Sequence, residues 1–328
     1  MARIAAAFAS SHSVMLTCTL EDWISRFRDR DDRLPFYDKL GNPLSYAQVL
    51  AEAPPNAASL VTPEAITQRF RDTQAAMDRM RDEVLGAKLD ALIICGDDQY
   101  ELFHDDHMPS IAIYYGDSVV NAGPPTEPVT DWYKQAQMRR REPNGAVTYP
   151  CHGKLALHLI EGLVGKGFDI SAVKSIPETE HEGHAYSFIH YRYLRGAPVP
   201  IVPIFLNTYN PPNQPTPQRC VALGKAIGEL VATFPDELRV GIMASGGMSH
   251  FRVEEDLDQS VFDAIKRKDL DFLAGLKPYR LLAGSSEIRN WIVAAAAAPH
   301  LNVTWTAYIP GYRTLALSGT GLGFARWS

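Results

Sequence analysis

The chain lacks the cysteine patterns that mark zinc ribbons, thiol–disulfide motifs and disulfide scaffolds. Its 328 residues include only four cysteines, which are far apart and form no CxxC pair: Cys18, Cys95, Cys151 and Cys220. Closely spaced cysteine pairs are the usual signature of such sites, so we expect none of them here. Isolated cysteines are typical of structural thiols in a reducing compartment, and we therefore expect a cytoplasmic location.

Long apolar runs and an excess of basic residues are also missing. No stretch approaches the roughly 20 apolar residues of a membrane-spanning helix, and the N-terminal apolar run is too short for a signal peptide. Lys and Arg total 32 against 38 Asp and Glu, which gives a formal net charge of -6. This balance predicts no nucleic-acid partner and no membrane partner. The 46% of hydrophobic residues is enough for a sizeable core.

Short apolar runs typical of buried strands alternate with amphipathic segments typical of helices. This alternation predicts an α/β fold, with a mostly parallel central sheet and helices on both faces, in a single domain over residues 1–328. Residues 20–60 are turn-rich, and we interpret them as an insertion in this domain. The expected strands are 3–9, 91–95, 110–115, 172–176, 199–206, 239–244 and 303–309, and the main helices are 64–88, 153–165, 218–233, 256–276 and 285–298.

Polar residues follow three of the predicted strands where each strand ends. His12 follows the first strand, the segment Asp97-Asp98-Gln99-Tyr100-Glu101 follows the strand that begins at Ala91, and His250 follows the strand that begins at Arg239. In open α/β sheets, ligands bind in the crevice beyond the carboxyl ends of the strands. These side chains are therefore candidates for a single site. The alternative is that the acidic segment is only a solvated turn.

Two further histidines and a glutamate extend this set. His181 and His184 lie in a loop after a fourth strand, and Glu287 lies at a predicted helix start. Two imidazoles and one carboxylate with open positions are the ligand set of non-haem Fe(II) oxygenases. The residues are scattered, and the chain has no HxxxH or HExxH run, so spacing alone does not define a site. The basic run 139–141 is expected to be a solvated helix end.

Four segments of the chain resemble the class III extradiol ring-cleavage dioxygenases, the family of the catalytic β subunit of protocatechuate 4,5-dioxygenase. The resemblance covers most of the chain and is weakest over residues 20–60. The segments are Ser10-Ser11-His12, Glu180-His181-Glu182-Gly183-His184, Gly246-Gly247-Met248-Ser249-His250, and Gly284-Ser285-Ser286-Glu287 with Trp291 four residues on.

The resemblance implies roles for these residues. It implies that His12 and Glu287 bind the metal, and that His181 or His184 is the catalytic acid and base. His250 either hydrogen-bonds a substrate oxygen or caps its loop. The implied cofactor is Fe(II), and the implied partners are a small aromatic substrate and O2.

One position departs from the family pattern. The family's second metal histidine follows an Asn-Asp pair, and Gln99 stands at its place here, with Asp98, Phe103 and Pro109 in register. A glutamine oxygen is a harder and weaker ligand than an imidazole. Gln99 either completes a metal set with His12 and Glu287, or a neighbour replaces it, or the site is degraded. The neighbours considered are Asp98, Glu101, His104 and His107, and the two histidines are expected to be solvated surface residues.

The resemblance implies Fe(II)-dependent extradiol cleavage of a catecholic, protocatechuate- or gallate-like acid. Arg313 and the adjacent Tyr312 are candidates for binding the substrate, with Arg313 pairing with its carboxylate. The alternative is that Arg313 is a structural surface residue. Gln99 leaves two alternatives open. One is an O2-independent metal-dependent hydrolase, lyase or decarboxylase, and the other is a non-catalytic subunit of a hetero-oligomer. The alternative to Fe(II) as cofactor is another divalent metal or none. A homo- or hetero-oligomer is expected in each case.

Overall fold

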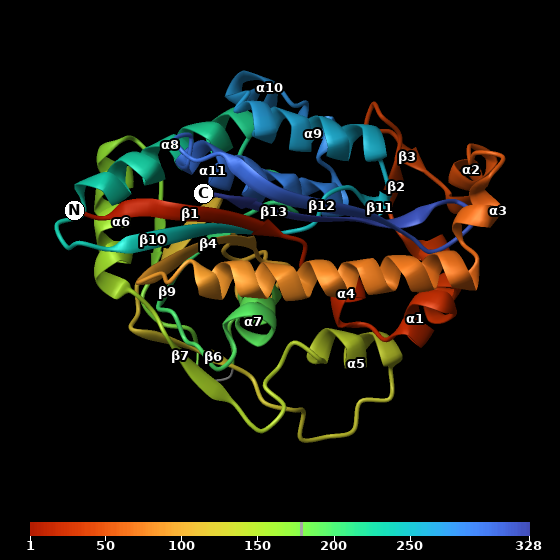
Figure 1. Cartoon of the computed structure of the whole chain (residues 1–328), viewed down its shortest axis with the longest axis horizontal. Helices are drawn as coiled ribbons and strands as arrows, with labels where there is room; N and C mark the ends of the chain where they lie inside the picture. The colour runs from red at the N-terminus through yellow and green to blue at the C-terminus, as the bar shows by residue number, and fades with distance from the viewer. Residues whose placement is uncertain (178–179) are drawn as a thin grey trace.

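The computed structural model describes residues 1–177 and 180–328 and contains one large mixed sheet (Figure 1). Its strands are β1 (Arg3–Ser10), β4 (Ala91–Asp97), β5 (Ile111–Tyr114), β8 (Ser171–Val173), β9 (Ile201–Leu206), β10 (Arg239–Ser245), β11 (His250–Arg252), β12 (Val303–Tyr312) and β13 (Ser318–Trp327). The order is β11-β13-β1-β10-β4-β9-β5-β8, with β12 paired to β13. β1, β10, β4 and β9 are parallel, whereas β13 is antiparallel to β1 and β5 to β9.

Helices cover both faces of the sheet because successive strand residues point to opposite sides. Ile93 and Ile242 face the layer that contains α6, α8, α9 and α11, whereas Ile94 and Met243 face the layer that contains α4 and α7. The predicted α/β fold is confirmed. The bounds of these helices are α4 (Pro63–Gly86), α6 (Gly153–Gly165), α7 (His184–Ile189), α8 (Pro217–Thr233), α9 (Glu255–Arg267) and α11 (Ile288–Ala297).

The remaining elements are short. Residues 20–60 fold into brief helices and one two-stranded ribbon, and their assignment as an insertion stays a prediction. These and the other short elements are η1 (Val14–Thr17), α1 (Leu20–Ile24), η2 (Arg26–Asp29), η3 (Asp31–Arg33), β2 (Phe36–Tyr37), β3 (Pro43–Leu44), α2 (Tyr46–Ala51), α3 (Ala57–Leu60), β6 (Ser118–Asn121), α5 (Trp132–Met138), β7 (Val147–Pro150), η4 (His190–Leu194), α10 (Leu270–Ala274), η5 (Pro278–Arg280) and η6 (Ala283–Glu287).

The sequence pattern does not predict β13, which is nevertheless one of the longest strands of the sheet. Its three glycines, Gly319, Gly321 and Gly323, interrupt the β-branched and aromatic pattern that marks strands. The structure shows why glycine occupies two of these positions. A Cβ on Gly319 would overlap the backbone of Gly311 in β12, and a Cβ on Gly321 would overlap the carboxylate of Asp258.

The four parallel strands end at one edge of the sheet, and this edge carries the polar side chains considered above. Ser10 at the end of β1 pairs with Ser245 at the end of β10, and Asp97 is the last residue of β4. Within the described residues, no helix has the length and apolar content needed to cross a membrane.

Candidate active site

A cavity of about 320 Å³ lies at the carboxyl ends of β1, β4 and β10. Four elements bring polar groups to it: His12 just beyond β1, Gln99 just beyond β4, His184 at the first turn of α7 and Glu287 at the end of η6. A larger open groove of about 960 Å³ is bordered by η1, α4 and α5. The buried imidazoles and carboxylates gather at the smaller cavity, which we therefore take as the candidate site.

His12 presents Nε2 to two carboxylates. Nε2 lies 3.2 Å from Oε2 of Glu287 and 3.5 Å from Oδ1 of Asp97, and the His12 side chain is almost fully buried. On the other side of the ring, Nδ1 lies 3.0 Å from the Ser245 hydroxyl, which donates its own proton to the Ala185 carbonyl at 2.7 Å. Ser245 must therefore accept from Nδ1–H, and this leaves Nε2 of His12 with a free lone pair.

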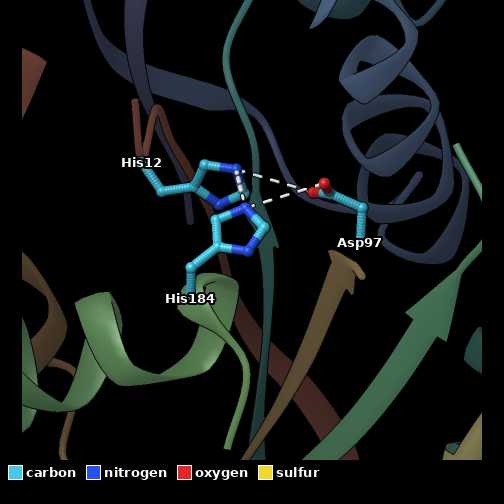
Figure 2. Close-up of side chains that lie close together, drawn as sticks. All are labelled: His12, Asp97 and His184. Carbon is cyan, nitrogen blue, oxygen red and sulfur yellow. Dashed lines mark hydrogen bonds and ion pairs between the residues drawn. The ribbon is translucent and has the colours of Figure 1, made fainter. Parts of the chain in front are cut away.

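Glu101 fixes the orientation of the His184 ring by accepting from its Nδ1–H group. Its Nδ1 lies 2.6 Å from Oε2 of Glu101, and its backbone N–H donates to both oxygens of the same carboxylate at 2.9 and 3.0 Å. Nε2 of His184 points into the site, 3.2 Å from Nε2 of His12 and 3.7 Å from Oδ2 of Asp97, as Figure 2 shows. Burial favours the neutral ring, but the Glu101 carboxylate outweighs it and raises the pKa of His184 to about 9.

Two buried carboxylates, of Asp97 and Glu287, both lie close to Nε2 of His12, and Glu287 also lines the cavity. Asp97 is 0% exposed and Glu287 is 2% exposed. Glu287 accepts hydrogen bonds from the Tyr209 hydroxyl at 3.1 Å and from the backbone N–H of Gly247. Burial and the charge of Glu287 raise the pKa of Asp97, whereas His12 overcomes the effect of burial and lowers the pKa of Glu287. A cation between the carboxylates and imidazoles would stabilise both charges.

Three residues have ligand atoms close enough to share one metal ion. The ligand atoms of His12, Asp97 and His184 all lie within 4.8 Å of one another, and all three residues are buried. Gln99 lies beside them, with Nε2 3.1 Å from Oδ2 of Asp97 and 3.4 Å from Nε2 of His184. Glu287 joins the group through His12. Of the predicted metal set, the structure brings His12, Gln99 and Glu287 together.

The neighbours considered as replacements for Gln99 point elsewhere. The Asp98 carboxylate closes its own turn by accepting the backbone N–H groups of residues 101, 102 and 103 at 2.9 to 3.3 Å. Glu101 binds His184. His104 and His107 are exposed, as expected for surface residues. Among the described residues, the Gln99 side chain forms hydrogen-bonding contacts with Asp97 and His184.

His250 also faces the cavity. Its Nδ1–H donates to the Met248 carbonyl at 2.8 Å, so its Nε2 is an acceptor. Burial lowers the pKa of His250 and favours the neutral ring. His181 does not line this cavity. It lines an adjacent one of about 250 Å³, together with Glu182 and Arg141.

Arg313 lines the cavity, but Tyr312 does not. The Tyr312 hydroxyl donates to Glu255, away from the site. Arg313 is only 4% exposed, so it is not a surface residue. Its Nε donates to Asp31 at 3.0 Å, and its Nη2 has no hydrogen-bond partner among the described residues. A buried guanidinium with an unused N–H group is suited to bind an anion.

Arg140 corrects the interpretation of the basic run 139–141 as a solvated helix end. The Arg140 side chain is 23% exposed, lines the cavity and lies 3.3 Å from Oε1 of Glu101. The roles of Asp97, Glu101 and Ser245 within the site did not emerge from the sequence. The position of Asp97 at the end of a predicted strand could have pointed to its role. No local pattern could do so for Glu101 and Ser245, because they contact histidines that are distant in the chain.

An α/β sheet with imidazoles and carboxylates buried at its strand ends defines a candidate metalloenzyme site. Residues 102–323 match the family model described as the catalytic LigB subunit of aromatic ring-opening dioxygenase. This match covers more than half of the chain, which therefore belongs to that family. The resemblance inferred from the sequence segments is confirmed at the level of the family.

Two characterised relatives are similar to parts of the chain. A gallate dioxygenase from Pseudomonas putida is 31% identical over 99 residues, which is 30% of this chain and 28% of the relative. A 2,3-dihydroxyphenylpropionate/2,3-dihydroxicinnamic acid 1,2-dioxygenase from Comamonas testosteroni is 27% identical over 183 residues, which is 55% of this chain and 50% of the relative. The aligned regions thus span half or less of these relatives.

Proposed function

We propose that this protein is a metal-dependent aromatic ring-opening dioxygenase that uses Fe(II) for extradiol cleavage of a catechol bearing a carboxylate. The observation that carries the proposal is the convergence of two imidazole nitrogens and two buried carboxylates, from four residues of which His12, His184 and Glu287 line one cavity. Family membership and the names of the two relatives support the reaction class.

The residues present fit a divalent metal. The Nε2 atoms of His12 and His184 are both left with lone pairs by their Nδ1 partners, yet they face each other at 3.2 Å. Two imidazole nitrogens at this separation share either a proton or a metal ion, and mixed imidazole and carboxylate donors suit Fe(II). His12 and Glu287 would hold it, together with a further group from Asp97, Gln99 and His184. A bound iron would supply Lewis acidity toward the catechol hydroxyls and electrons for O2 chemistry.

The chain's own residues supply binding and proton transfer. The guanidinium of Arg313, which lines the cavity, can bind a substrate carboxylate, and this would orient the ring there. The neutral His250 can accept a proton from a substrate hydroxyl at Nε2 and later return it. Apart from His12, a proposed metal ligand, His184 is the other imidazole among the described residues that lines the cavity, so proton transfer belongs to His250 or His184.

The test is O2 consumption by anaerobically purified, Fe(II)-reconstituted protein with protocatechuate, gallate or catechol. We expect stoichiometric O2 uptake and a ring-opened product that contains both oxygen atoms of ¹⁸O2 by mass spectrometry. His12→Ala and Glu287→Ala should each abolish metal retention, whereas Gln99→His should preserve or strengthen it. The control is His104→Ala, an exposed imidazole in the same loop as Gln99.

Other outcomes would select the remaining alternatives. Turnover of a phenolic acid without O2 would indicate a metal-dependent hydrolase, lyase or decarboxylase. Metal-free protein that co-purifies with a second, related chain would indicate a non-catalytic subunit. Metal content that is indifferent to His12 would contradict the proposed site. Oligomeric assembly and a cytoplasmic location stay predictions.

A further inference from the structure

We propose that His184 is the protein ligand that replaces the missing imidazole at position 99, and that Glu101 is the residue that positions it. This inference rests on the proposed function, because it takes a metal ion to bind at this site. It goes further by naming His184 as one of the residues that bind the ion. The replacement comes from the start of α7, 85 positions from Gln99 along the chain, rather than from the loop that carries Gln99.

The spacing of the donor atoms supports this assignment. Two nitrogens that each lie about 2.1 Å from one ion in adjacent coordination positions are separated by about 3.0–3.4 Å. Nε2 of His184 lies 3.2 Å from Nε2 of His12. The carboxylates are at similar separations, since His12 Nε2 lies 3.2 Å from Glu287 and 3.5 Å from Asp97. Nε2 of His184 therefore lies at a distance from Nε2 of His12 that allows both nitrogens to bind the same metal ion.

The hydrogen bonds of the two rings fix their protons away from each other. Ser245 accepts from Nδ1–H of His12, and the Glu101 carboxylate accepts from Nδ1–H of His184. Neutral rings in these tautomers have no hydrogen to place between the two Nε2 atoms. The contact at 3.2 Å therefore needs either an added proton on one ring or a cation between the two nitrogens, and a metal ion satisfies both lone pairs.

Glu101 holds His184 in this orientation through several contacts. It contacts His184 through both the ring and the backbone N–H, and Arg140 lies 3.3 Å from its other side. Gly183 permits this close approach, because a Cβ there would lie 2.8 Å from Oε2 of Glu101. A carboxylate behind a ligating histidine is a common arrangement at metal sites, where it fixes the tautomer.

Gln99 directs its amide N–H group, and not a ligand atom, toward the proposed metal ligands. Its amide Nε2 lies 3.1 Å from Oδ2 of Asp97, at hydrogen-bonding distance from a carboxylate that faces both histidines. An amide N–H group is a donor and does not ligate a cation. With His184 acting as a ligand, proton transfer in the proposed reaction falls to His250.

The experiment measures metal affinity by equilibrium dialysis with Co(II), and metal content by inductively coupled plasma mass spectrometry. His184→Ala should lower Co(II) affinity by at least about 100-fold, and Glu101→Gln by about 10- to 100-fold, as for other residues behind a ligand. Gln99→Ala should change it by less than about threefold. The matched control is His181→Ala, an imidazole of the same segment that lines a different cavity.

Co(II) absorption gives a readout that a structural role would not change. A lost imidazole shifts the d–d bands of any Co(II) that remains, whereas Gln99→Ala should leave them in place. Should His184→Ala fail to fold by circular dichroism, His184→Asn keeps a donor toward Glu101 and is measured instead. The double variant Gln99→His/His184→Asn should recover binding if an imidazole is what the site needs.

Two results would overturn the inference. One is a His184 variant that keeps full Co(II) affinity and loses only turnover, as an acid–base residue would. The other is a large loss of affinity in Gln99→Ala. The proposed function fails separately, if metal-loaded wild-type protein consumes no O2 with any catechol while its affinity still depends on His184.

Discussion

At the scale of single residues, the chemistry of the site depends on which nitrogen of each histidine carries the proton. His12, His184 and His250 each direct Nδ1 to an acceptor: the Ser245 hydroxyl, the Glu101 carboxylate and the Met248 carbonyl. As a result, all three Nε2 atoms are available to the cavity. The residues behind the histidines therefore decide which ring nitrogen faces the cavity.

The first prediction concerns Ser245→Ala. This substitution removes the acceptor of Nδ1–H of His12, so the ring loses its fixed tautomer and orientation. We expect metal affinity to fall by about 10- to 100-fold with little change in overall fold. Equilibrium dialysis checks the affinity. The control is Ser13→Ala, whose hydroxyl contacts Thr320, and an equal loss in both variants would contradict the prediction.

The second prediction concerns Arg313→Lys. Lysine keeps a positive charge beside the buried Asp31 but loses the planar fork that binds a carboxylate through two N–H groups. The KM for protocatechuate should rise about 10-fold, whereas the KM for catechol, which has no carboxylate, should stay within about twofold. Steady-state O2 uptake measures both. An equal rise for the two substrates would show that Arg313 shapes the cavity without binding the carboxylate.

At the scale of elements, close contacts between glycines and neighbouring backbones set the position of the ligands. A Cβ on Gly96 in β4 would lie 2.6 Å from the Cβ of Ala185 in α7. The strand that carries Asp97 and the helix that carries His184 are thus in direct contact. On the opposite face, Gly224 and Gly228 of α8 admit the backbone of α11, which explains the alanine run of that helix.

The third prediction follows from the contact between β4 and α7. Gly96→Ala should push α7 away from the strand, lower the free energy of unfolding by about 1–3 kcal/mol and weaken metal binding. Urea denaturation and metal dialysis measure the two effects. Gly86→Ala is the matched control, because a Cβ there meets nothing within 4 Å at the end of α4. Similar effects in both variants would refute the packing argument.

At the scale of the whole molecule, distant segments combine to close the site. Asp31, from the segment 20–60, is 1% exposed and binds Arg313, which follows β12. Asp258 of α9 is 0% exposed and joins the loop after β10 to β12, because it accepts hydrogen bonds from Ser249 and from the Tyr308 hydroxyl. Burial raises the pKa of Asp258 to about 7.

The fourth prediction is a dependence of stability on pH that Asp258 causes. Its folded-state pKa lies above the ordinary value of 3.8, so its stabilising contribution is complete below about pH 4 and is lost as pH rises through about 7. Each pKa unit corresponds to about 1.4 kcal/mol, so the loss amounts to a few kcal/mol.

Urea denaturation at several pH values between 4 and 8 tests this prediction. The wild-type free energy of unfolding should fall relative to that of Asp258→Asn as pH rises. The control is Asp263→Asn on an exposed position of the same helix, which should keep the wild-type dependence. Parallel curves for wild type and Asp258→Asn would contradict the prediction.

The sequence by itself determined the fold class and the strand ends on which the site is built. Apolar strands followed by polar residues are local patterns, and they correctly located His12, Gln99 and His250 at one edge of the sheet. The family resemblance added Glu287. The strand β13 was not predicted because its glycines break the usual strand pattern. They are needed for close packing against β12 and α9, and this contact exists only in the folded chain.

Only the tertiary structure decided which side chains meet. His184 lies 172 positions from His12, yet their Nε2 atoms are 3.2 Å apart, and no local pattern encodes that distance. The same holds for Ser245 behind His12 and Glu101 behind His184. The departure at Gln99 was visible in the sequence. That His184 lies beside Gln99 could not be predicted, because it depends on how the start of α7 packs against the end of β4.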